Sequence, residues 1–241
     1  MSEFKMPTEV IELPSKGLIY PESNPLSSGK VEMKYMTAKE EDILTNQAYI
    51  KDGTVLDKLL KSLIVSEIDY NDLVIGDKNA ILIASRILGY GSEYSFSIGG
   101  VEHTVDLGTL DNKPFDESKI KKGENKFDYT LPHSNIEISF RLLTHGDEGK
   151  INAEIQGYKK IDKNASPELT TRFKHMILAV DGKTDKKDIR DFIDNHLLAR
   201  DSRALREYIK QIQPDVDLTY VLDSGQVIDI PINLNFFWPD A

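Results

Sequence analysis

Residues 30–35 alternate between apolar and polar side chains, which is the pattern of a strand with one buried face. Thr37 and Glu40 follow directly and form a Thr-x-x-Glu capping box. In such a box the threonine hydroxyl accepts the N3 amide, and the glutamate accepts the amide of the N-cap residue. The pattern therefore predicts a strand that leads into a capped helix over residues 38–50.

The same pattern occurs a second time. Residues 136–142 again alternate, and Thr144 and Asp147 repeat the capping box with a shorter acid. The offset between Thr37 and Thr144 is 107 residues (144 − 37). An internal repeat of this kind decides the architecture of a chain, so the flanking sequence has to match as well.

Further landmarks follow one another in the same order in both halves. They pair Leu13-Pro14-Ser15 with Leu131-Pro132-His133, Asp52-Gly53 with Asp181-Gly182, Asp77 with Asp201, and a hairpin-like segment over 93–107 with one over 217–232. We therefore expect an α+β fold made of two internally repeated units, each a strand, helices and a β-hairpin. The alternative is two unrelated α+β halves that share common helix caps.

The distribution of proline, glycine and charge sets the expected boundaries. Residues 1–29 hold four prolines and several turn residues, so we expect an extended arm. The first repeat is expected over 30–110, a polar, lysine-rich linker over 111–126, and the second repeat over 127–241, which includes an aromatic C-terminal tail.

Apolar spacing and capping residues predict the remaining elements. Hairpin turns are expected at Gly99-Gly100 and at Asp223–Gly225. Helices are expected over 54–65, 77–88, 150–161, 166–181, 185–198 and 202–212.

Composition excludes several classes of protein. The 241 residues suffice for one or two domains, and 39% are hydrophobic and 29% charged, as in ordinary globular proteins. A net charge of −10 argues against a non-specific nucleic-acid binder. No apolar run is long enough for a membrane span, and the first 25 residues lack the apolar core of a signal peptide. We expect the protein in the cytoplasm or in a particle assembled there.

Catalytic and metal-binding patterns are missing from the sequence. There is no cysteine, and the five histidines do not have metal-ligand spacing. Ser139, His145 and Asp147 could be drawn as a triad, but His145 belongs to the capping box, where a solvent-facing role is expected. The sequence therefore favours a non-enzymatic protein without metal or cofactor.

The C-terminal end is unusually aromatic, whereas chain termini are normally polar and frayed. One interpretation is that these rings fill the core of the second repeat. The other is that they anchor a partner protein, together with the helix over 202–212. The candidate partner interface consists of Phe236, Phe237, Trp238, Tyr208 and Ile212.

Several motifs together resemble a known family. They are Leu13–Tyr20, Met36–Asp42, Asp77–Leu82, Phe140–Thr144, and the closing Ile230-Pro231 with Phe236–Pro239. They are similar to motifs of the baseplate hub subunits and hub assembly proteins of T-even-type contractile-tailed phages. The resemblance covers about residues 11–239, nearly the whole chain.

This resemblance implies a non-enzymatic role in building the central hub of the phage tail baseplate. The implied partners are other hub or tape-measure proteins, and a second copy of the chain is a further candidate. The primary expectation is a structural hub subunit of the virion tail. The alternative is an assembly chaperone that acts in the host cytoplasm and is absent from the finished virion.

The chain departs from the family at one point. Many members carry Cys-x-x-Cys pairs in the two hairpins, but here those places hold Ile98-Gly99-Gly100 and Leu222–Gly225. Without thiolates a zinc ribbon is not available. We therefore expect the hairpins either to be held by packing or to be shorter.

Overall fold

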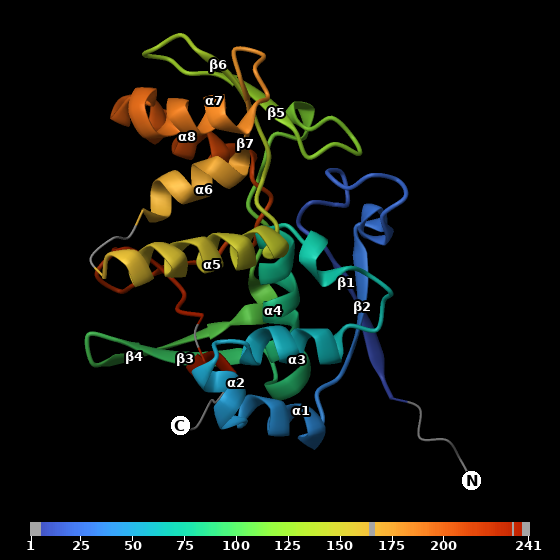
Figure 1. The fold of residues 1–241 in the computed structure, drawn as a ribbon. Coiled ribbons are helices and arrows are strands. Elements are labelled where there is room, and N and C mark those ends of the chain that lie inside the picture. The colour runs from blue at the N-terminus through green and yellow to red at the C-terminus, as the bar shows by residue number, and fades with distance from the viewer. Residues whose placement is uncertain (1–5, 164–166, 233, 238–241) are drawn as a thin grey trace.

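In the computed structural model, the described residues are 6–163, 167–232 and 234–237, and they form a mixed α+β fold (Figure 1). The N-terminal half contains two antiparallel strand pairs and four α-helices. Its elements are β1 (Thr8–Glu12), β2 (Lys30–Lys34), α1 (Ala38–Leu44), α2 (Gln47–Lys51), α3 (Val55–Leu63), α4 (Ile75–Tyr90), β3 (Glu93–Ile98) and β4 (Val101–Asp106).

The C-terminal half contains the remaining strands and helices. Its elements are β5 (Phe127–Thr130), β6 (Glu137–Phe140), α5 (His145–Ile161), α6 (Glu168–Met176), β7 (Ile177–Val180), α7 (Lys186–Asp191), a π-helical turn over Phe192–His196, α8 (Ala199–Ile212), β8 (Thr219–Val221) and β9 (Val227–Asp229). A short 3₁₀ helix over Leu234–Phe237 closes the described chain.

All strand pairing is antiparallel. β1 pairs with β2, β3 with β4 and β8 with β9, while β5, β6 and β7 form a three-stranded sheet in that order. In each half, one strand also pairs with the residue that follows a helix. Met33 of β2 bridges Ile64 after α3, and Phe140 of β6 pairs with Ile177 after α6.

Both predicted capping boxes are present, and each acid also holds a cation. The Thr37 amide donates to Glu40 at 3.0 Å, and the Thr144 amide donates to Asp147 at 3.0 Å. Lys34 then donates to Glu40 at 2.8 Å, and Arg141 donates to Asp147 at 2.7 Å. The cation stands three residues before the threonine in both halves, so the end of each strand is tied to the start of the next helix.

A second pair of acids fixes the loops inside the first hairpin of each half. Asp77 is the third residue of α4, and it accepts bonds from the Ser15 amide at 2.9 Å, the Ser15 hydroxyl and the Tyr20 hydroxyl. Asp201 is the third residue of α8, and it accepts the His133 amide at 2.8 Å and the Ser134 amide at 3.0 Å. The two Leu-Pro segments thus reach an acid at the same helical position.

Buried apolar side chains form one continuous cluster that includes residues of both halves. The C-terminal segment contributes to it by returning to the first half (Figure 1). There the buried Arg86 guanidinium of α4 donates to the carbonyls of Gly91, Glu93 and Phe236. Because Arg86 collects three carbonyls, it fixes the end of the chain against α4 and β3.

The N-terminal arm differs from its expected form. Residues 8–12 form β1 and pair with β2, while Leu13, Ile19 and Tyr20 are buried in the core. The prolines and glycines of this segment make turns between buried side chains. Its described part is therefore built into the first half.

Residues 111–126 are likewise attached to both halves. Asn112 bridges Val216, the Gly123 amide donates to the Leu18 carbonyl, and the Asn125 side chain bonds the backbone of Leu142. Although their composition is polar, as expected of a linker, hydrogen bonds hold these residues to both halves.

The helix expected over 166–181 ends early. α6 stops at Met176, and Ile177–Val180 form the edge strand β7. The apolar run fits a helix or a strand by periodicity, and pairing with β6 decides the outcome. The predicted N-cap Ser166 lies outside the described residues. None of the described helices is long and apolar enough to cross a membrane.

Candidate interaction sites

Phe236 and Phe237 are fully buried within the chain, so the expectation that they form an exposed anchor is wrong. The Phe236 ring packs edge-on against Tyr94 of β3 at 4.8 Å, and against Phe237 at 5.3 Å. Its carbonyl accepts from Arg86 Nε at 2.8 Å. The core that these rings enter is that of the first half, not that of the second half as the other interpretation predicted.

The other members of the predicted interface lie elsewhere. Tyr208 is half-buried and stacks on Tyr129 of β5 at 4.4 Å, and Ile212 is buried. Trp238 lies outside the described residues. Tyr208 and Ile212 pack in the second half and the two phenylalanines in the first, so the structure does not bring these four residues into one surface.

The drawn triad is not assembled. Ser139 donates to Asp128, Asp147 accepts from Arg141, and the His145 ring lies beside Lys78 and Asp57. Each of the three side chains therefore has a different partner, and they do not form a triad with one another.

His145 sits at a contact between the two halves, where its expected solvent-facing position is wrong. Its ring lies 4.5 Å from the Tyr70 ring, with Nδ1 3.0 Å from Lys78 Nζ and Nε2 3.4 Å from Asp57. Burial and the Lys78 ammonium lower the pKa of His145. A neutral imidazole at this position joins α5 to elements of the first half.

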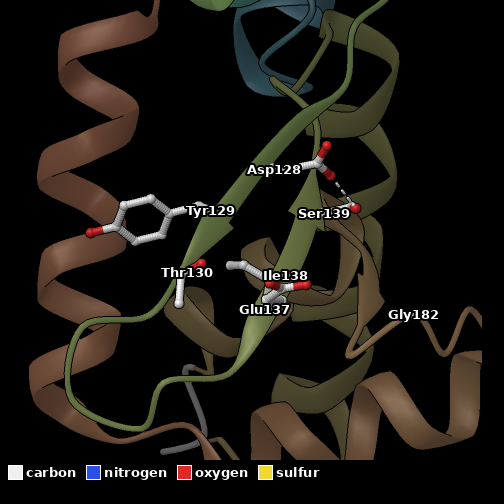
Figure 2. Close-up of a pocket in the computed structure, with 7 residues that line it drawn as sticks. All are labelled: Asp128, Tyr129, Thr130, Glu137, Ile138, Ser139 and Gly182. Atoms are coloured by element: carbon white, nitrogen blue, oxygen red, sulfur yellow. Dashed lines mark hydrogen bonds between the residues drawn. The ribbon is translucent and has the colours of Figure 1, made fainter.

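A polar hollow of about 410 Å³ lies along β5 and β6 (Figure 2). Asp128 and Ser139 are hydrogen-bonded to each other across it, and Glu137 lies at its other end. The Tyr129 side chain points toward the neighbouring helix, in keeping with its stacking on Tyr208. Two separated carboxylates and a hydroxyl give this hollow no evident catalytic arrangement.

A second hollow of about 580 Å³ lies among α5, α6, β7 and α7 and is rich in cations. We call it the basic hollow. Its charged lining comprises the cations Arg141, Lys150, Lys174, Lys186 and Arg190 and the acids Asp147 and Glu154. Three apolar residues also line it: Leu178 is half-buried, whereas Ile177 and Ile189 are buried in the core.

The two acids of the basic hollow already have cationic or histidine partners. Asp147 bonds Arg141 at 2.7 Å, and Glu154 lies 3.0 Å from His175. Burial alone would raise the pKa of Asp147, but the hydrogen bonds from Arg141 and Thr144 outweigh it and lower that pKa. Asp147 therefore stays ionised at neutral pH and neutralises Arg141.

The exposed cations of the basic hollow have weaker or no ion-pair partners among the described residues. Lys186 and Arg190 are exposed and have no ion-pair partner among the described residues, and the Lys150 side chain is 71% exposed with its closest acid at 3.8 Å. A chain of net charge −10 thus presents a local positive surface. Such a surface can bind carboxylates or other anions.

Within the described ranges no group of three or more acidic or histidine side chains could hold a metal ion. Comparison with known proteins gave no match to any family model, curated protein or solved structure.

Sequence reasoning missed the basic hollow. Its cations lie up to 49 residues apart (190 − 141), with Arg141 directly after β6 and the others on α5, α6 and α7, and none of them stands out in the sequence by itself. A signal existed only in the lysines and arginine of 183–190, which stand in an otherwise acidic chain.

Proposed function

We propose that this chain is a non-enzymatic phage tail protein that acts in forming the baseplate hub, as a structural hub subunit. The observation that carries the proposal is the set of sequence motifs that resemble the hub family of T-even-type contractile-tailed phages. They extend over nearly the whole chain and in one order.

The positions of these motifs in the fold support that proposal. Leu13–Tyr20 supplies the donors to Asp77, Met36–Asp42 contains the first capping box, and Phe236 is held by Arg86. The first and last of these motifs thus make contacts between distant parts of the chain, and the second starts a helix. Motifs with such roles suit a family defined by its fold and its assembly contacts.

A non-enzymatic role is also supported by the use of the buried charged groups. Glu40, Asp77, Asp201 and Arg86 each bind backbone or side-chain groups that hold two elements together. Hydrogen bonds of this kind account for these buried charges without reference to a substrate.

The same proposal includes an internal duplication, in which residues 30–110 and 127–241 are copies of one unit. It is supported by the paired capping boxes, the cation three residues before each, and the Asp at the third position of α4 and of α8. It is also supported by the element order, since a strand, helices and a closing hairpin follow one another in both ranges, although β7 between α6 and α7 has no counterpart in the first half. Repeated units of this kind are common in proteins that act by binding other subunits.

Quantitative mass spectrometry of purified tails and of infected-cell lysate tests the role. The phage that encodes the chain is used, with a knockout of the gene as control. A hub subunit is expected in finished tails at a fixed ratio to the other baseplate proteins, and the knockout is expected to make no complete tails.

Other outcomes separate the alternatives. A chain that is abundant in lysate and in assembly intermediates but missing from finished tails would be an assembly chaperone. Normal tails from the knockout would contradict both roles.

A further inference from the structure

The basic hollow differs from the corresponding region of the first half. Ile43 stands six residues after the N-cap Thr37, and Lys150 stands six residues after the N-cap Thr144. Ile43 packs against the hydrophobic core, whereas Lys150 is exposed at the rim of the basic hollow. The first half therefore places an apolar side chain where the second half has a cation.

The acid at the base of each region differs in the same way. Glu40 is fully buried, and its carboxylate accepts bonds from Lys34, Thr37 and Ser62. Asp147 is also nearly buried, but it lies in the lining of the basic hollow beside Arg141 and Lys150. The first region is closed by its own side chains, and the second stays open.

Charge and shape indicate the class of occupant. The exposed cations Lys150, Lys186 and Arg190 line the hollow together with the half-buried Leu178, so a ligand that carries both acidic and apolar groups fits this lining. An acidic peptide segment with interspersed aliphatic residues supplies both.

The rest of the chain argues against nucleic acid as the occupant. A nucleic acid extends well beyond one hollow, and outside it the polyanion would face a chain of net charge −10. That repulsion acts over a Debye length of about 8 Å at physiological salt. A short acidic segment can instead lie within the positive surface.

We infer that the basic hollow is a docking site for an acidic, aliphatic-bearing segment of a partner protein. The inference deepens the proposed function, since the expected partner is another hub or tape-measure protein, and the contact would give an otherwise acidic subunit one oriented attachment point.

Site-specific photo-crosslinking in phage-infected cells tests this inference. A photoreactive amino acid replaces Lys186 in the hollow, and in a matched control it replaces Lys210, an exposed lysine on α8. Adducts are isolated and the crosslinked peptide is sequenced. We expect adducts at position 186 to map to an acidic segment of one partner, and adducts at position 210 not to map to that segment.

Charge reversal gives a second readout. K186E/R190E removes the exposed positive charges of α7, and K39E/K210E makes the same change in net charge on exposed sites outside the hollow. Because rim charges control association, we expect the first double variant to lower affinity for the crosslinked partner about tenfold or more. The second should leave that affinity unchanged.

Several results would overturn the inference. They are adducts at position 186 to nucleic acid or to neutral or basic segments, no adducts at that position, or equal loss of affinity in both double variants. These outcomes differ from a failure of the proposed function. That failure is recognised when neither tails nor assembly intermediates contain the chain, whatever segment is crosslinked.

Discussion

Asp77 and Asp201 occupy the same position in their helices but have opposite electrostatic environments. Burial raises the pKa of Asp77, although Ser15 and Tyr20 donate to it. Burial would also raise that of Asp201, but the amides of His133 and Ser134 outweigh burial and lower the pKa of this carboxyl. Similarly placed contacts in the two halves therefore shift the pKa of their carboxyl groups in opposite directions.

The two capping acids extend this comparison. Burial would raise the pKa of Glu40, but hydrogen bonds from Lys34, Thr37 and Ser62 lower it to about 2. Asp147 has a lowered pKa for a similar reason and yet borders an open hollow. The capping boxes are alike in the two halves, but the surfaces around them differ. We therefore look for the partner-binding difference on the second half.

The largest effect is expected from removing a ring that joins the end of the chain to the first half. Phe236→Ala should lower the free energy of unfolding by about 3–5 kcal/mol, because a fully buried aromatic side chain leaves a cavity. Tyr208→Ala, at a half-buried site, should cost less. Denaturant unfolding measures both, and an equal or smaller loss for Phe236→Ala would contradict the assigned packing.

The next largest effect is expected from replacing Arg86 of α4. Lys210 of α8 serves for comparison, because it stands 124 residues later (86 + 124), at the same offset as Asp201 from Asp77. Arg86→Met should cost about 3 kcal/mol, because the buried Phe236 carbonyl and the partly buried carbonyls of Gly91 and Glu93 lose a charged donor. Lys210→Met should change stability by less than about 0.5 kcal/mol, since Lys210 is exposed. Thermal and denaturant unfolding of both variants provide the test, and similar losses would remove the distinction.

A smaller loss of stability is expected when either aspartate is replaced by asparagine, and the loss should differ between the two sites. Asp201→Asn should cost about 1–3 kcal/mol at pH 7, because an amide oxygen and an NH₂ group cannot both accept backbone amides. Asp77→Asn should cost less, since its hydroxyl donors can rotate to accept from the new NH₂ group.

The pH dependence of these two variants has opposite signs. The lowered pKa of Asp201 gives stability that is present above its unfolded pKa of about 3.9 and is lost as the pH falls through the folded value. The raised pKa of Asp77 gives stability that is fully present below about 3.9 and is lost as the pH rises through the folded value. The deficit of Asp201→Asn should therefore shrink in acid, and Asp77→Asn should improve relative to wild type as the pH rises.

The smallest effect is expected at the basic hollow. K186E/R190E should leave the free energy of unfolding within about 0.5 kcal/mol of wild type, because both side chains are exposed and lack ion-pair partners among the described residues. A large loss of stability would show that these cations serve the fold.

Short sequence motifs predicted several helix starts and turns. The spacing of Thr37 and Glu40, and of Thr144 and Asp147, predicts a helix start at each place. Gly99-Gly100 forms the expected turn, with φ of 60° and 84°. The sequence marks the Leu-Pro segments and the two aspartates as matched landmarks, but it does not predict the hydrogen bonds between them.

Long-range contacts were not predictable in the same way. The position of Phe236 depends on Arg86, which lies 150 residues away, and Ile177–Val180 became a strand only because β6 lies beside it. The basic hollow depends on four elements that meet only in the folded chain. Sequence spacing contains none of this information.

A crystal structure of the purified protein, with residues 11–110 superposed on 127–237, tests the central claim of duplication most directly. We expect Thr37 to fall on Thr144, Ala80 on Ala204 and Asp77 on Asp201, with each aspartate bound by the Leu-Pro segment of its own half. A different strand and helix order in the two halves, or Leu-Pro segments away from these acids, would contradict the account.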